Sequence, residues 1–352
     1  MVGDRSASAA HFPAGEWETR LPEELGFDRD KLEAAWKRFR EELLGADGQS
    51  RVCVVRRGYL AAEWTAGIGP EEQVNQASAA KSVFSSLLGI AVAEGRIPSA
   101  DAVVSAYYPE MLEVPEGRGP KPGRHNKAED AQITFRHLIS NTSGYLKPGE
   151  RPGECFHYQT YGMNVLMHAL GRVYGVYDSN DPEGSVGPGE LIRSKIRDPI
   201  GGTWPWYWGN FAVHAEAKLG VFGYYTGLLM TCRDQARLGW LWRHAGAWAG
   251  RQVVPAEWIR AATTSTAITR NASPDEPIDG VGVYGCGFWT NDRGKLWPAL
   301  PRDSFAASGA GSQLIWVCPS LDLVIAQSPG APGQQQQRES RLLEWIVGAL
   351  AD

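Results

Sequence analysis

QASAAKSVFSSLLGIAVAEGRI, residues 76–97, is the stretch that decides the fold. Its helical pattern runs from about Ala77 to Glu94 and is ended by Gly95, a residue that commonly terminates helices. Serine, glycine and alanine recur along an otherwise apolar segment, which is typical of a helix packed closely by its neighbours. We therefore expect a buried helix and not a surface helix.

Ser78 and Lys81 form the only Ser-x-x-Lys sequence of the chain and stand in the first turn of this helix. Residues three apart share one helix face, so the Lys81 amine can approach the Ser78 hydroxyl. A serine needs a nearby base to become a nucleophile, and a buried lysine can serve or relay the proton. The tetrapeptide alone also fits a capping serine followed by a surface lysine.

Strand-like runs lie at both ends of the chain, and helical patterns fill the middle. This order predicts an α+β fold, in which one antiparallel sheet built from both ends is flanked by terminal helices and carries an inserted all-helical domain. We place the sheet domain at 17–105 plus 280–352 and the helical domain at 106–279, with the active site between them. Residues 1–16 are expected to be flexible.

The composition excludes several classes of function. The net charge is −5 and the sequence contains no basic stripe, so a nucleic-acid partner is not expected. Five widely spaced cysteines suggest neither a disulfide framework nor a zinc site. No segment approaches about 20 consecutive apolar residues, and the first residues lack the apolar stretch of a signal peptide. A cytoplasmic protein without membrane contact, metal or organic cofactor is expected.

Several stretches resemble the serine β-lactamase-like superfamily, which includes class C β-lactamases, penicillin-binding proteins, D-Ala-D-Ala peptidases, family VIII esterases, nylon-oligomer hydrolases and some transacylases. Residues 76–97 resemble its nucleophile helix. The likeness extends over about 17–350 and is carried further by LPEELGFDRDKLEAAWKRF (21–39), VCVVRRGYLAAEW (52–64), ITFRHLISNTSGY (133–145) and RDQARLG (233–239). The resemblance implies the β-lactamase/transpeptidase-like fold, with Ser78 as the nucleophile.

The family's second motif, a tyrosine two residues before an asparagine, corresponds here to Tyr158 and Thr160. The resemblance makes Tyr158 a catalytic base or proton shuttle, with Tyr161 as the alternative. Thr160 replaces the usual asparagine and is assigned to substrate binding.

The third motif is Lys-Thr-Gly on a strand, but the matching strand SFAASGAG (304–311) has no lysine. It resembles the Ala-x-Gly variant of esterases and amidases, at Ala307-Ser308-Gly309. We expect a backbone N–H from Ala307, Ser308, Gly309 or Ala310 to complete an oxyanion hole with that of Ser78. The missing lysine argues against β-lactams as main substrates.

Trp204, Trp206 and Trp208 alternate with other residues in an apparent loop. They are predicted to wall the substrate cleft, although core packing is the ordinary role of such aromatic residues. With Trp289 they would favour an apolar acyl group.

These observations predict a serine hydrolase or acyltransferase that cleaves a small-molecule ester or amide through a Ser78 acyl-enzyme. An amine or alcohol could accept the acyl group. The alternatives are a β-lactamase or D-Ala-D-Ala peptidase and, in another class, a non-catalytic penicillin-binding-like receptor domain. Substrate and oligomeric state are left open.

Overall fold

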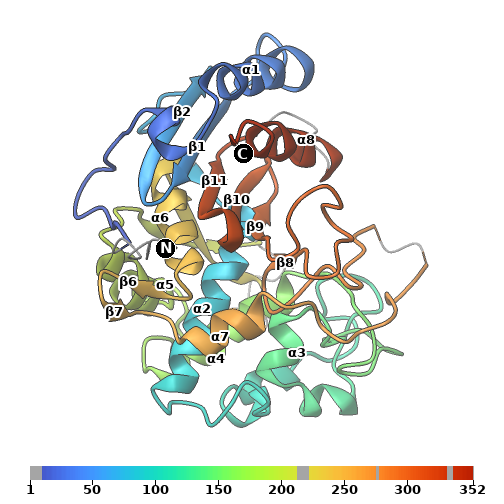
Figure 1. The fold of residues 1–352 in the computed structure, drawn as a ribbon. Coiled ribbons are helices and arrows are strands. Elements are labelled where there is room, and N and C mark those ends of the chain that lie inside the picture. The colour runs from blue at the N-terminus through green and yellow to red at the C-terminus, as the bar shows by residue number, and fades with distance from the viewer. Residues whose placement is uncertain (1–9, 212–221, 275–276, 331–335, 352) are drawn as a thin grey trace, which may run out of the picture.

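The computed structural model describes residues 10–211, 222–274, 277–330 and 336–351. At its centre is a six-stranded antiparallel sheet that combines the two ends of the chain (Figure 1). Its strands follow the order β2 (Tyr59–Ala66), β1 (Ser50–Arg56), β11 (Leu323–Gln327), β10 (Gln313–Cys318), β9 (Phe305–Gly309) and β8 (Trp289–Thr290). The expected fold class, an antiparallel sheet built from both ends and flanked by helices, is confirmed.

Helices cover both faces of this sheet. Side chains alternate between the faces of a strand, so Val52 and Val54 pack towards α1 (Arg29–Phe39) and α8 (Gln336–Val347). Cys53 and Val55 belong to the core on the other side, where α6 (Cys232–Arg243) lies. Burial on both faces explains why the inner strands are nearly continuous apolar runs.

α6 lies unusually close to the sheet because Gly239 carries no side chain. A Cβ at that position would be 2.4 Å from Val324 Cγ1. The helix thus packs on β10 and β11, although its sequence position falls within the predicted helical domain of 106–279. The predicted domain boundaries remain a prediction. α6 is an element of the region assigned to the insert that packs on the central sheet.

The helix expected at 77–94 is a short 3-10 turn, Ala77–Ala79, followed by α2 (Ala80–Ala93). Every residue from Ala80 to Ala91 is buried, so this helix is surrounded by protein as its composition predicted. On one side of α2, the Trp258 ring of α7 (Ala256–Ala262) packs against Gly89. A Cβ built on Gly89 would lie 2.4 Å from that ring, so a larger residue would not fit there. A rigid, fully packed helix is a suitable base for a nucleophile at its N-terminus.

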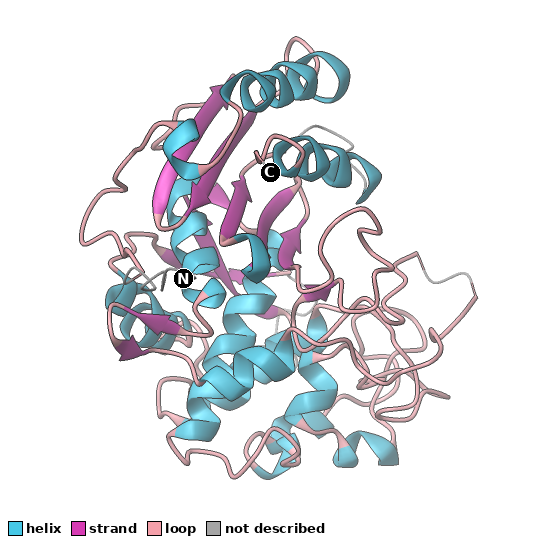
Figure 2. Ribbon diagram, viewed as in Figure 1, coloured by secondary structure: helices cyan, strands magenta, loops and turns pink. Residues whose placement is uncertain are grey.

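The region between the two halves of the sheet is mostly helical and is rich in loops around α3 (Phe135–Ile139) (Figure 2). The expectation that it holds helices alone is wrong. It also contains a three-stranded antiparallel sheet and a two-stranded hairpin. The remaining elements are α4 (Tyr161–Val173), α5 (Gly189–Ile192), β3 (Val74–Asn75), β4 (Trp206–Asn210), β5 (Tyr224–Met230), β6 (Ala247–Trp248) and β7 (Arg251–Gln252).

Within the described residues, no helix combines the length and the apolar character that crossing a membrane requires. All five cysteines are buried, and none of them is joined in a disulfide bond in this structure.

Candidate active site

Ser78 and Lys81 face each other at the N-terminal end of α2. The Lys81 Nζ and the Ser78 Oγ are 2.7 Å apart, a hydrogen bond that the three-residue spacing anticipated. The turn before them is held in an uncommon conformation, since Ala77 has φ of 46° and donates its N–H to Asn75 Oδ1 at 2.8 Å. Backbone strain of this kind is concentrated at functional sites, where the surrounding structure maintains it.

The Lys81 side chain is only 3% exposed, whereas Ser78 is partly exposed. The alternative of a surface lysine is therefore excluded. A lysine amine loses its hydration when buried, so it needs polar or aromatic neighbours. One neighbour is Tyr158, whose ring centre lies 4.9 Å from Lys81 Nζ.

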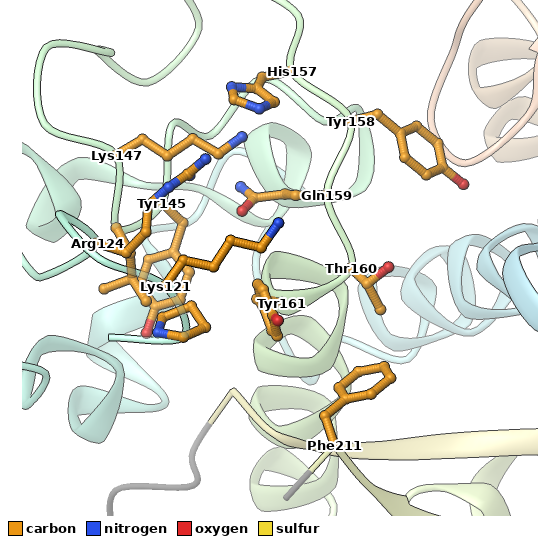
Figure 3. Close-up of a pocket in the computed structure, with 12 residues that line it drawn as sticks. Lys121, Arg124, Tyr145, Lys147, His157, Tyr158, Gln159, Thr160, Tyr161 and Phe211 are labelled. Atoms are coloured by element: carbon orange, nitrogen blue, oxygen red, sulfur yellow. The ribbon is translucent and has the colours of Figure 1, made fainter. Parts of the chain in front are cut away.

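Tyr158 is held by other aromatic rings. It stacks on Trp289, with ring centres 6.2 Å apart, and meets Tyr284 edge to face at 6.1 Å. Figure 3 shows Tyr158 pointing away from the side chains that cluster beyond Gln159. These contacts leave the Tyr158 ring next to the Ser78–Lys81 pair and restrict its movement.

Two other tyrosines near the site are less suited to proton transfer. Burial raises the pKa of Tyr284 well above its ordinary value, and the neighbouring Tyr158 adds to this shift. Tyr161, the alternative named from sequence, begins α4 and packs edge to face on Phe222, with ring centres 5.7 Å apart. Neither Tyr161 nor Tyr158 lines the pocket that contains Ser78, so the two are distinguished by the contact of the Tyr158 ring with Lys81 Nζ.

The end of β9 lies against the nucleophile. A Cβ built on Gly309 would be 2.9 Å from Ser78 N and 2.7 Å from Ala79 N, so only glycine permits this approach. β8 pairs with Phe305 and Ala306 but ends there, which leaves the edge of β9 at Ala307–Gly309 open towards Ser78. Backbone groups of this edge and the Ser78 N–H are thus neighbours, as an oxyanion hole requires.

The other residues predicted to supply the oxyanion-hole N–H differ in their exposure to solvent. Ala307 is fully buried, Ser308 is half-buried, and Ala310 is exposed in the turn that follows β9. The choice of the donor among these backbone N–H groups stays open. Lys295, the lysine nearest to this strand in sequence, does not replace the missing strand lysine, because its Nζ donates a hydrogen bond to Asp279 Oδ2 at 2.7 Å.

Ser78 and Lys81 line a pocket of about 230 Å³. Thr160, predicted to bind substrate, also lines it, together with Asn164 one helical turn later. The apolar part of its wall consists of Phe84, Met163, Phe211 and Tyr225. The pocket therefore combines a polar floor at the nucleophile with an aromatic and apolar wall.

The three tryptophans do not form that wall. Trp204 is 1% exposed and lies in the core. Trp206 and Trp208 lie on β4 and also pack against that core. Because side chains alternate along a strand, the residues between and after these tryptophans face the other way. Tyr207 is one of them, and its hydroxyl accepts a hydrogen bond from Asn75 Nδ2 at 2.6 Å.

The expectation that these tryptophans wall the cleft is therefore wrong. The wall is built instead by residues on the face of β4 and β5 that points away from the tryptophans. Phe211 stacks on Tyr225 with ring centres 4.6 Å apart, and both line the Ser78 pocket. The sequence signal that could have found these residues is a period of two over 206–211, which gives β4 and the residue after it two distinct faces.

Thr226 is a further pocket residue that sequence reasoning missed. It is 3% exposed, lines the Ser78 pocket, and its Oγ1 has no hydrogen-bond partner among the described residues. A buried hydroxyl without a partner costs free energy, which a bound molecule could recover. No group of three or more histidine, cysteine or acidic side chains within the described parts of the chain is arranged to hold a metal ion.

Comparisons with known proteins agree with this fold. The chain is similar to a penicillin-binding-protein homologue from Caulobacter crescentus, with 16% identity, a TM-score of 0.67 and coverage of 95% of this chain and 99% of the other. It is similar to a family VIII carboxylesterase, with 16% identity, a TM-score of 0.65 and coverage of 95% and 99%.

A third similar structure is EstCE1, described as a hydrolase with promiscuous acyltransferase activity, at 13% identity, a TM-score of 0.63 and coverage of 93% and 98%. A search of curated proteins finds no match. The profile of the Beta-lactamase family matches residues 42–329, which include Ser78, Lys81, Tyr158 and β9. The chain therefore belongs to the Beta-lactamase family.

Proposed function

We propose that this protein is a serine hydrolase or acyltransferase that cleaves an ester or amide through an acyl-enzyme on Ser78. The observation that carries the proposal is the 2.7 Å contact between Lys81 Nζ and Ser78 Oγ at the floor of a pocket. Among the described residues, neither side chain makes another hydrogen bond, and Tyr158 lies next to the pair.

In the proposed reaction, Ser78 Oγ attacks the substrate carbonyl carbon while its proton passes to the Lys81–Tyr158 pair. The carbonyl oxygen becomes an oxyanion, which the Ser78 N–H and a backbone N–H of β9 stabilise. The bond to the leaving alcohol or amine then breaks, and that group takes the proton. Water, or an acceptor alcohol or amine, releases the acyl group by the reverse sequence.

The absence of a lysine on β9 supports an ester or amide over a β-lactam. In the related enzymes that act on β-lactams, this lysine supplies charge for the substrate carboxylate, whereas the corresponding residues here are Ala307, Ser308 and Gly309. The similarity to a family VIII carboxylesterase supports the same choice.

We expect a short-chain nitrophenyl ester to be turned over with a higher kcat/KM than nitrocefin. The reason is that the nitrocefin carboxylate gains little binding energy beside an uncharged β9. Both substrates are followed by absorbance, and the acyl adduct is located by mass spectrometry of the peptide that contains Ser78. A higher kcat/KM for nitrocefin would favour the β-lactamase alternative. Absence of any adduct with esters, nitrocefin or a fluorophosphonate would favour the non-catalytic receptor alternative.

Acyl transfer is a second expected activity. The wall of Phe84, Met163, Phe211 and Tyr225 can exclude water from the acyl-enzyme and bind an apolar acceptor. Thr160 also stands where the family has asparagine, and a changed side chain there can alter how the attacking water is held. The similarity to a hydrolase with acyltransferase activity supports this reading.

We expect rising concentrations of a small amine or alcohol to divert part of the product from the acid to the amide or ester. The measurement is the product ratio from one nitrophenyl ester, determined by chromatography. Exclusive formation of the acid over a varied panel of acceptors would identify a plain hydrolase.

A further inference from the structure

One polar side chain of the Ser78 pocket is both buried and unpaired. Thr226 on β5 lines this pocket and is 3% exposed, and its Oγ1 has no hydrogen-bond partner among the described residues. No other described residue that lines the pocket has a buried side-chain nitrogen or oxygen without a partner. The Asn164 amide, for example, donates to the backbone oxygen of Phe222 at 2.7 Å. Because buried polar groups are nearly always paired, the Thr226 hydroxyl calls for an explanation.

The position of Thr226 relative to the nucleophile is fixed by the backbone. Gln76, two residues before Ser78, donates its N–H to the backbone oxygen of Leu228, two residues after Thr226, at 3.0 Å. β3, directly before Gln76, pairs with the following part of β5. The turn that carries Ser78 and the strand that carries Thr226 are therefore joined by hydrogen bonds. A molecule in the pocket meets both side chains at a set spacing, as a preorganised site requires.

The Thr226 side chain lies on the buried face of β5. Thr226 is paired with Trp208 of β4, and directly opposed residues of an antiparallel ladder have their side chains on the same face. Trp208 packs against the core, and its Nε1 donates to the backbone oxygen of Pro182 at 2.6 Å. Tyr225, the preceding residue, borders the pocket from the other face, where it stacks on Phe211. The hydroxyl thus faces the pocket from its buried side.

The surroundings favour a small neutral group as the partner of Thr226. Of the described residues that line the pocket, Lys81 is the only lysine, arginine or acidic residue, and its amine is engaged with Ser78 Oγ at 2.7 Å. A charged substituent beside Thr226 would lose its hydration without gaining an opposite charge from that hydroxyl. A substrate hydroxyl needs only a donor and an acceptor, and a threonine hydroxyl is both. The volume of about 230 Å³ limits the acyl group to a short chain.

We propose that Thr226 is a specificity-determining residue whose hydroxyl binds a hydroxyl group on the acyl chain of the substrate. The inference rests on the proposed function, since it assumes that the acyl carbonyl lies at Ser78. It names the substrate class as short-chain hydroxyacyl esters or amides. An acyl chain of the same shape without the hydroxyl leaves Thr226 Oγ1 unpaired and is therefore a poorer substrate.

The test compares the phenyl ester of 3-hydroxybutanoate, as each enantiomer, with that of 3-methylbutanoate, in which a methyl group replaces the hydroxyl. The esters of 2-hydroxypropanoate and 2-methylpropanoate form a second pair, with the hydroxyl one carbon closer to the carbonyl. We expect kcat/KM for the better hydroxyacyl enantiomer to exceed that of its methyl counterpart by about tenfold or more in at least one pair. Phenol release gives the rates, and the uncatalysed hydrolysis of each ester corrects for its intrinsic reactivity.

Thr226→Val replaces the hydroxyl by a methyl group and should lower this ratio about tenfold. Because Oγ1 has no partner within the described residues, the substitution should leave the temperature of thermal unfolding unchanged or raise it. Thr226→Ser keeps the hydroxyl and should keep most of the preference. Thr290→Val is the matched control, because Thr290 on β8 is also buried with an Oγ1 that no described residue binds, yet it does not line the Ser78 pocket. It should leave the ratio unchanged.

A ratio near one in both pairs, or a ratio that Thr226→Val leaves unchanged, would overturn the role of Thr226. If esters still acylate Ser78 in that case, the proposed function stands without it. If no ester acylates Ser78, calorimetric titration of the Ser78→Ala protein with 3-hydroxybutanamide and 3-methylbutanamide tests the pocket alone. Tighter binding of the hydroxyamide that Thr226→Val removes would support the role of Thr226, and equal or absent binding would refute it.

Discussion

Ser78→Ala is expected to lower ester turnover by roughly 10³-fold or more while leaving the fold intact. Within the described residues, the Ser78 hydroxyl has one hydrogen-bond partner, Lys81 Nζ at 2.7 Å, and Ser78 is partly exposed at the pocket floor. Its removal therefore deletes the nucleophile without opening a cavity in the core. Steady-state kinetics with a nitrophenyl ester measure the loss, and thermal unfolding verifies the fold.

Ser85→Ala is the matched control for this variant. Ser85 lies on the same helix and is fully buried, with its Oγ accepting a hydrogen bond from Trp258 Nε1 at 3.2 Å. We expect Ser85→Ala to lose stability by about 1 kcal/mol, because a buried hydrogen bond is broken, and to keep turnover within a few-fold. Retention of more than a tenth of wild-type turnover by Ser78→Ala would remove Ser78 from the role of nucleophile.

Lys81→Met and Tyr158→Phe are each expected to lower turnover by about 10²-fold or more, and the double variant should be little worse than the more damaged single variant. The reason is that Lys81 Nζ lies both at Ser78 Oγ and 4.9 Å from the Tyr158 ring centre, so the two side chains form one proton relay. Both substitutions keep the size of the side chain and its apolar contacts. The four kcat/KM values of this cycle are the measurement.

Tyr161→Phe is the comparison variant, because Tyr161 neighbours Tyr158 in sequence but its ring packs on Phe222, whereas the Tyr158 ring lies 4.9 Å from Lys81 Nζ. Its turnover should stay close to that of the wild-type protein. Losses that multiply in the double variant would argue against a shared relay. A larger loss in Tyr161→Phe than in Tyr158→Phe would transfer the role to Tyr161.

The sheet and its flanking helices could be predicted from local pattern because each element carries its own signal. The runs at β1, β2, β10 and β11 are short, apolar and separated by turn residues, and Arg57 and Gly58 indeed adopt the positive φ angles of a tight hairpin. β4 was missed because Pro205 stands directly before it and Gly209 lies within it, and both residues weaken the pattern that usually identifies a strand. Its pairing with β5, a distant segment, provides the stabilisation that local propensity does not.

Residues of the candidate site could likewise be predicted from the sequence only where local geometry sets their spacing. Ser78 and Lys81 could be paired from sequence because three residues along a helix set their separation without any tertiary contact. Tyr158 was placed by its family resemblance, and the contact with Lys81 that supports it joins residues 77 positions apart. Phe211, Tyr225 and Thr226 were not found, since which face of a strand borders a pocket depends on what packs against the other face.

The sequence by itself determined the fold class, the buried nucleophile helix and the Ser78–Lys81 pair, because periodicity and helix geometry act over a few residues. Only the tertiary structure decided that β9 meets Ser78 at Gly309 and that Trp204 lies in the core with Trp206 and Trp208 packed against it. These are contacts between segments distant in sequence. They depend on how whole elements pack, and the free energy of that packing belongs to the assembled core and not to any single stretch of chain.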